Sequence, residues 1–157
     1  MKEEIFFRQE CKTKSELIEE YRYVNVDHDW SDIIIEYHEA RLMELGYHDI
    51  QIVWRGFGSQ GDGASFTAKR DFNGTTVEIY RTRNHLSCHE NTMFVEAEDE
   101  MRLGMILSLQ RDAREMARDI YRDLESAYDH LTSDEIVWET IVANDYFGWE
   151  CEHDSKW

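Results

Sequence analysis

The stretch from Ala64 to Arg81, ASFTAKRDFNGTTVEIYR, alternates apolar and polar side chains on both sides of Asn73-Gly74. Alternation with a period of two is typical of a strand that buries one face. Asn and Gly both tolerate positive φ, and this pair is a strong signal for a two-residue hairpin turn. We therefore expect two antiparallel strands, over residues 64–70 and 75–81.

Two further segments extend this hairpin into a meander. Residues 50–54 precede it and residues 91–97 follow it, and both have a strand-like composition. Apolar residues at helical spacing predict helices over 15–23, 30–45, about 98–131, and 134 to about 143. This order predicts an α+β fold, in which an antiparallel β-meander of about four strands packs against N-terminal and C-terminal helices.

The predicted helices have expected caps. Ser15 is expected to cap the first helix, Asp29 to cap the second, and Thr132-Ser133-Asp134-Glu135 to form a capping box for the last. Gly46 is the expected left-handed stop of the helix 30–45. A short edge strand is expected over 146–149. The stripe of the helix 30–45 expected to face the sheet is Trp30, Ile33, Ile34, Tyr37, Arg41 or Leu42, and Leu45.

Composition indicates a folded protein with an unusual charge. The 157 residues are 41% hydrophobic and 13% aromatic, with no proline and no marked linker, so we expect one domain over residues 1–157. The net charge of −17 disfavours binding to nucleic acid or to an anionic membrane, and favours a basic partner. No apolar run is long enough for a membrane helix, and three widely spaced cysteines fit a reducing cytosol.

The segment between the first two predicted strands, WRGFGSQGDGASF over residues 54–66, is rich in glycine. Its backbone amides, with Ser59, Gln60, Asp62 and Ser65, are candidates to hold a nucleotide or phosphate. However, no Lys follows the last glycine, a strand rather than a helix comes next, and the Asp62 carboxylate would repel a phosphate. A turn stabilised by hydrogen bonds from backbone to Asp62 is the favoured interpretation, and ligand binding is the alternative.

Metal binding and catalysis are less well supported. The group His85, Cys88 and His89, joined to Cys151 and His153, has ligands that suit zinc, but neither cluster has the paired Cys-x-x-Cys arrangement. Whether these residues bind metal stays open, and we predict no metal site and no cofactor. No nucleophile elbow is present and no histidine is singled out as a base, so a non-enzymatic protein is expected.

Acidic side chains gather in the predicted C-terminal helices. Residues 96–157 contain 17 acidic and six basic residues. Interleaved arginines favour a solvated surface with ion pairs such as Glu115 with Arg118 or Arg111. The alternative is a surface in which carboxylates stand in for phosphates and occupy the basic groove of a partner. The predicted partner-binding residues are Asp112, Glu115, Asp119, Asp123, Glu135 and Glu139.

The sequence GFGSQGDGASF, residues 56–66, resembles a G-F-x-S-Q-G-D-G-A-x-F signature of small, uncharacterised proteins of tailed bacteriophages. The resemblance implies a phage source and a place in the host cytoplasm, and assigns no catalytic residue. Small acidic phage proteins often inhibit host defence or nucleic-acid enzymes. We therefore expect an acidic inhibitor of a basic, nucleic-acid-handling host protein, acting in counter-defence or host take-over, with nucleic-acid mimicry as one way of inhibiting it. An oligomer based on Trp149 and Trp157 is a third hypothesis.

Overall fold

The computed structural model describes residues 12–83 and 86–146. These residues form two compact units. Unit 1 comprises the described residues up to His28 together with those from Tyr128 onward, and unit 2 comprises those from Asp29 to Ala127. The prediction of one domain over 1–157 stays a prediction.

Unit 2 confirms the predicted α+β fold with four antiparallel strands in one sheet. The strands are β1 (Tyr47–Arg55), β2 (Gly63–Phe72), β3 (Thr75–Arg81) and β4 (Met93–Ala97), in the order β1-β2-β3-β4. Asn73 and Gly74 have φ of 50° and 83° in the β2–β3 turn, as their sequence predicts. A short 3-10 helix, η1 (Glu90–Thr92), leads into β4.

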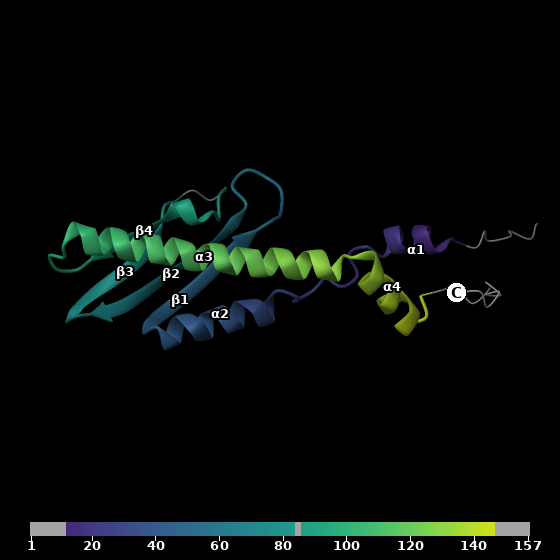
Figure 1. Cartoon of the computed structure of the whole chain (residues 1–157), viewed down its shortest axis with the longest axis horizontal. Helices are drawn as coiled ribbons and strands as arrows, with labels where there is room; N and C mark the ends of the chain where they lie inside the picture. The colour runs from purple at the N-terminus through teal and green to yellow at the C-terminus, as the bar shows by residue number, and fades with distance from the viewer. Residues whose placement is uncertain (1–11, 84–85, 147–157) are drawn as a thin grey trace, which may run out of the picture. The chain divides into compact units, whose positions relative to one another are not determined.

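Two helices of unit 2 pack on one face of this sheet. They are α2 (Asp32–Glu44) and α3 (Leu103–Leu131), whose last residues belong to unit 1. Figure 1 shows α3, in green, crossing the sheet. The core joins Phe66 and Ile79 of the sheet to Leu42 of α2 and to Ile120 and Leu124 of α3, all at most 2% exposed. The helix 98–131 is therefore confirmed in its main part.

The face that α2 buries matches the predicted stripe only in part. Ile33 and Tyr37, which were expected to face the sheet, are 75% and 57% exposed. Leu42 of the predicted stripe is buried, and Trp30 and Ile34 pack against the core, whereas the burial of His38 was not predicted. A histidine can occupy this position because Asp123 of α3 satisfies its ring nitrogen, and apolar spacing cannot show such a polar pair.

The caps also differ from those predicted, although Gly46 does end α2 with a φ of 91°. Ser31 is the N-cap residue of α2, whereas Asp29 lies outside the helix with a φ of 39°. A capping box of Thr13 and Glu16 begins the first helix, α1 (Lys14–Glu20), in place of Ser15. The sequence did contain this signal, because of the two hydroxyl residues in Thr13-Lys14-Ser15-Glu16 only Thr13 has a Glu three positions later, and the choice of Ser15 overlooked it.

Unit 1 pairs α1 with α4 (Asp134–Ala143) around four buried residues: Leu17, Ile18, Val137 and Ile141. Arg22, which follows α1, donates to the Thr132 carbonyl at 3.0 Å and pairs with the Asp134 carboxylate. The predicted capping box of α4 is wrong, because Ser133 makes no side-chain cap and its hydroxyl donates to the His130 carbonyl instead. Tyr146 is not in a strand, and residues 147–149 lie outside the described residues.

Each edge of the sheet is modified. At the β4 edge, the Thr82 amide donates to the Thr92 carbonyl, so that carbonyl points toward β3. Successive carbonyls of a strand point to opposite edges, so the Met93 carbonyl points away from β3, toward the unpaired edge of β4. Arg114 of α3 fills that position, with Nε and Nη2 donating to the Met93 oxygen at 3.1 and 2.9 Å. In β1 the pairing register shifts between His48 and Gln51.

Candidate functional site

The part of α3 in unit 2 arranges its charges in two rows. Asp112, Glu115, Asp119 and Asp123 follow one another at intervals of three or four residues, so they form one row along the helix, here called the acidic flank. Arg111, Arg114, Arg118 and Arg122 form a second, adjacent row, because each precedes an acidic residue by one position and successive residues lie about 100° apart around the helix. Spacing alone leaves the two rows side by side, so the contacts of each arginine decide whether it reaches the acidic flank.

The arginines of α3 make contacts that sequence did not predict. Neither Glu115–Arg118 nor Glu115–Arg111 forms an ion pair in the described part of the chain. Arg118 Nε lies 3.3 Å from Glu90 Oε1 beside η1, and the Arg114 guanidinium lies 5.1 Å from the Phe94 ring centre. Arg111 and Arg122 instead make exposed pairs with Asp112 at 3.3 Å and Asp119 at 3.1 Å.

Asp123 has a second role within unit 2. Its Oδ2 lies 2.8 Å from Nε2 of His38, whose side chain is only 4% exposed, whereas that of Asp123 is 52% exposed. The contact connects α2 to α3 and satisfies a buried imidazole. Asp123 is consequently both an exposed member of the acidic flank and a structural residue, and substituting it would disturb the fold as well as the charge.

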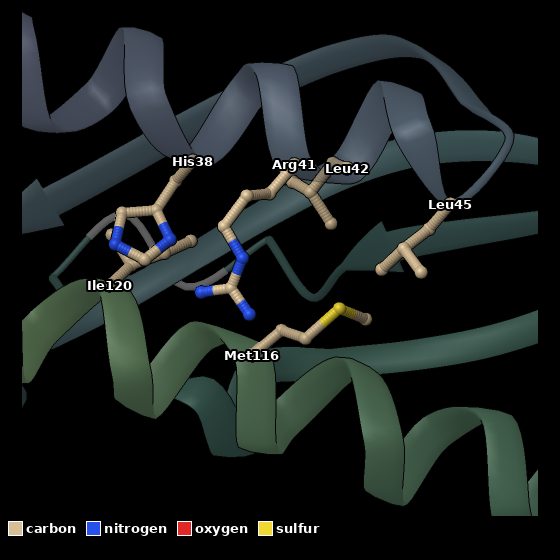
Figure 2. A pocket seen from close by; sticks show the side chains of 6 residues that line it. All are labelled: His38, Arg41, Leu42, Leu45, Met116 and Ile120. Carbon is tan, nitrogen blue, oxygen red and sulfur yellow. The ribbon is translucent and has the colours of Figure 1, made fainter.

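Beside the acidic flank, α2 and α3 enclose a shallow groove (Figure 2). Its lining residues are His38, Arg41 and Leu42 of α2, the C-cap residue Leu45 that follows it, and Met116 and Ile120 of α3. The space holds about 20 Å³, which is room for roughly one water molecule and far below the several hundred Å³ of a usual ligand pocket. Sequence reasoning missed this groove, although Arg41 and Leu45 at an interval of four residues could have indicated it.

The glycine-rich loop is stabilised from within. The Ser59 amide donates to Asp62 Oδ2 at 2.6 Å, as the favoured interpretation of this loop predicts. A Cβ on Gly56 would lie 2.8 Å from the Asp62 carboxylate, so the loop closes tightly around that group. The Tyr121 hydroxyl donates to the Gly56 carbonyl at 3.2 Å, and burial, with Glu125 and Asp62 nearby, raises the pKa of Tyr121 above its usual value.

The four candidate ligand residues of this loop lie in different environments. Ser59 and Gln60 are exposed, Asp62 is half-buried and holds the Ser59 amide, and Ser65 is fully buried in β2. The Ser65 hydroxyl has no hydrogen-bond partner among the residues that the structure describes. As folded, Ser65 cannot reach a ligand at the loop surface, and ligand binding by this set stays a prediction.

The segment 86–92 covers one side of the glycine-rich loop. The Cys88 amide and the Ser87 hydroxyl both donate to the Gly61 carbonyl, at 3.0 and 3.3 Å. Arg81 Nη2 donates to the Ser87 carbonyl at 2.9 Å. Among residues 12–83 and 86–146, no three His, Cys, Asp or Glu side chains are grouped to hold a metal ion. Of the candidate ligands, Cys88 and His89 lie there, whereas His85, Cys151 and His153 lie outside the described residues.

The last two predicted partner-binding residues belong to unit 1. Glu135 and Glu139 are exposed on α4, four residues apart on one side of that helix. Their part in binding stays a prediction. No helix in the described part of the chain is long and apolar enough to cross a membrane.

A family model with the description "Domain of unknown function (DUF8835)" matches residues 30–78. These 49 of the 157 residues include α2, β1, the glycine-rich loop and β2, and end within β3. No curated protein and no solved structure matches the chain. The match is consistent with an uncharacterised family, and it places the glycine-rich loop and half of the α2–α3 groove within the matched region.

Proposed function

We propose that this chain is a non-enzymatic protein that binds a basic, nucleic-acid-handling protein of a bacterial host and inhibits it. The acidic flank of α3 is the contact surface in this proposal, with its carboxylates in the positions that phosphates would take in the partner's groove. The resemblance of residues 56–66 to a bacteriophage signature supports the setting, in which such inhibition serves counter-defence in the host cytoplasm.

The observation that carries the proposal is that two of the four arginines in this part of α3 are held away from the acidic flank. Arg114 and Arg118 are directed toward β4 and η1, where they contact Met93, Phe94 and Glu90. They are therefore not placed to neutralise the acidic flank. Asp112 and Asp119 do have arginine neighbours, but both pairs are exposed, and exposed pairs contribute little free energy. A partner's Lys and Arg side chains can thus replace these contacts at small cost.

Affinity purification tests the proposal directly. The tagged full chain is expressed in infected bacterial cells, and retained proteins are eluted with increasing salt. We expect the column to retain a basic nucleic-acid-binding protein. It should elute at or above an ionic strength of about 0.15 M, where the Debye length is about 8 Å or less and attraction between surface charges is screened. Adding the chain to that purified protein should release its nucleic acid.

A pair of matched variants assigns the binding to α3. Glu115→Lys with Asp119→Lys removes the centre of the acidic flank, while Glu78→Lys with Glu96→Lys makes the same charge change on the open face of the sheet. We expect only the first pair to lose the partner. Equal retention by both, or no basic protein retained by the unmodified chain, would contradict the proposal. Asp123 is left unchanged because it holds His38.

A further inference from the structure

The α2–α3 groove combines an apolar floor with exposed apolar neighbours. Leu42 and Ile120 are buried at its base, whereas Leu45 at its end is 48% exposed. Ile33 and Tyr37 on α2 are more exposed still. Large apolar side chains gathered at a surface often mark a protein contact. As folded, the groove has room for roughly one water molecule, so an apolar side chain of another protein fits there only when the lining side chain of Arg41 moves out.

Arg41 shows which kind of group this groove accepts. Its guanidinium extends between α2 and α3 toward Met116 (Figure 2), and it lies 5.8 Å from the Tyr37 ring centre. Arg41 forms no ion pair with any described residue. A cation with an apolar stem thus already lies in the groove, beside a helix whose near flank is acidic.

The carboxylates of the acidic flank are spaced like the side chains along one side of a second α-helix. From Asp112 to Asp123 it covers 11 residue intervals, or about 16 Å at 1.5 Å per residue. A second helix lying along α3 would present Lys or Arg at the same intervals of three and four residues. Its adjoining apolar side would then face the groove, as in other complexes where an amphipathic helix occupies an apolar groove.

We propose that the α2–α3 groove seats a basic amphipathic α-helix of the partner protein, with apolar residues between Leu45 and Met116 and cations against the acidic flank. This inference rests on the proposed function and specifies the partner's docking element. Arg41 is displaced when the helix binds. The bound helix would gain apolar burial from the groove and orientation from the row of charges, so neither feature alone suffices.

Two labelled peptides and the full chain test this inference. The first peptide is a Leu/Lys sequence of about 18 residues, or five helical turns, with its leucines on one side. The second has the same composition in an order that spreads the leucines around the helix. Fluorescence anisotropy at physiological salt should show the first binding at least about tenfold more tightly, a difference of about 1.4 kcal/mol.

Groove variants separate apolar seating from charge. Leu45→Glu should weaken binding of the amphipathic peptide by about tenfold or more, because it places a charge where a leucine enters. Leu107→Glu is the matched control, since Leu107 is 52% exposed on α3 and does not line the groove. Arg41→Ala should tighten binding by several-fold, because no internal cation then competes. Weaker binding by Arg41→Ala would overturn the inference.

The outcomes distinguish the two proposals. If Glu115→Lys with Asp119→Lys abolishes binding but both peptides bind equally and Leu45→Glu has no effect, the groove inference fails and the acidic surface stands. If this charge reversal leaves peptide binding unchanged, the proposed function fails as well. Circular dichroism of each variant confirms that it is folded, and Leu45→Ala provides a milder substitution should Leu45→Glu unfold the chain.

Discussion

Tyr121 connects α3 to the glycine-rich loop through a single hydroxyl. Tyr121→Phe removes its hydrogen bond to the Gly56 carbonyl, and we expect a loss of about 1 kcal/mol in the free energy of unfolding at neutral pH. Because the folded state raises the pKa of this phenol above 10.0, the unfolded state releases its proton first. The stabilisation is therefore present below pH 10 and declines as pH rises through the folded-state pKa.

Urea unfolding of both proteins between pH 8 and 11 checks this expectation. The difference in stability between the unmodified chain and Tyr121→Phe should shrink at the alkaline end. A difference that stays constant across this range would contradict a raised pKa of Tyr121 in the folded state.

Gly63 and Gly58 provide a test of close backbone approach. Both have positive φ, 154° and 118°, but a Cβ on Gly63 would lie 2.8 Å from His89 Cα, whereas one on Gly58 would meet nothing within 4 Å. Gly58→Ala should cost about 1–3 kcal/mol for backbone strain alone. Gly63→Ala should cost about 1–3 kcal/mol more, because the segment 86–92 must move. Equal losses in chemical denaturation would contradict this packing.

Single residues were the hardest features to predict. The role of Asp62 was foreseen because a carboxylate in a glycine-rich turn has few other partners than backbone amides. The burial of His38 was not, because its partner Asp123 lies 85 residues away along the chain. Hydrophobic spacing predicts where apolar side chains lie, and cannot show where a polar pair replaces them.

At the scale of elements, the sheet offers an electrostatic test. Lys69, Glu78 and Glu96 lie directly opposite one another on adjacent strands, so two like charges meet at the β3–β4 pair. Glu96→Lys would give an alternating row, and we expect a stabilisation of about 0.2–1 kcal/mol that decreases with added salt. Glu98→Lys, just beyond β4, changes charge equally and should stabilise less. If Glu96→Lys instead lowered the stability, repulsion between Glu78 and Glu96 would be excluded as a destabilising contact.

The strands were predicted more reliably than the faces of the helices. The alternation around Asn73-Gly74 gave β3 its exact bounds, because a two-residue turn determines the register of both strands. Along α2, apolar residues occur on several sides, and Ile33 and Tyr37 are exposed. The acidic flank could be predicted from α3 alone, whereas the groove beside it needs two helices that contact only in the folded chain.

At the scale of the whole molecule, the two units should differ in stability. Among the described residues, the core of unit 1 has four buried apolar residues, whereas the core of unit 2 has 13. Small cores resist local opening less well. Hydrogen exchange should therefore be faster for amides of α1 and α4 than for those of β2 and β3. Leu17→Ala should speed exchange in unit 1 and leave β2 protected; uniform exchange across both units would contradict this expectation.

The contact between Arg114 and the edge of β4 has a consequence for self-assembly. An uncovered edge strand can recruit a strand of another molecule, which is the first step toward cross-β aggregates. The Arg114 guanidinium donates to the Met93 carbonyl, which an added strand would need as a hydrogen-bond acceptor. Arg114→Ala should make the protein aggregate faster on mild heating, as measured by thioflavin fluorescence, whereas Arg111→Ala should not. An arginine that holds the fold together would thus also keep neighbouring molecules apart.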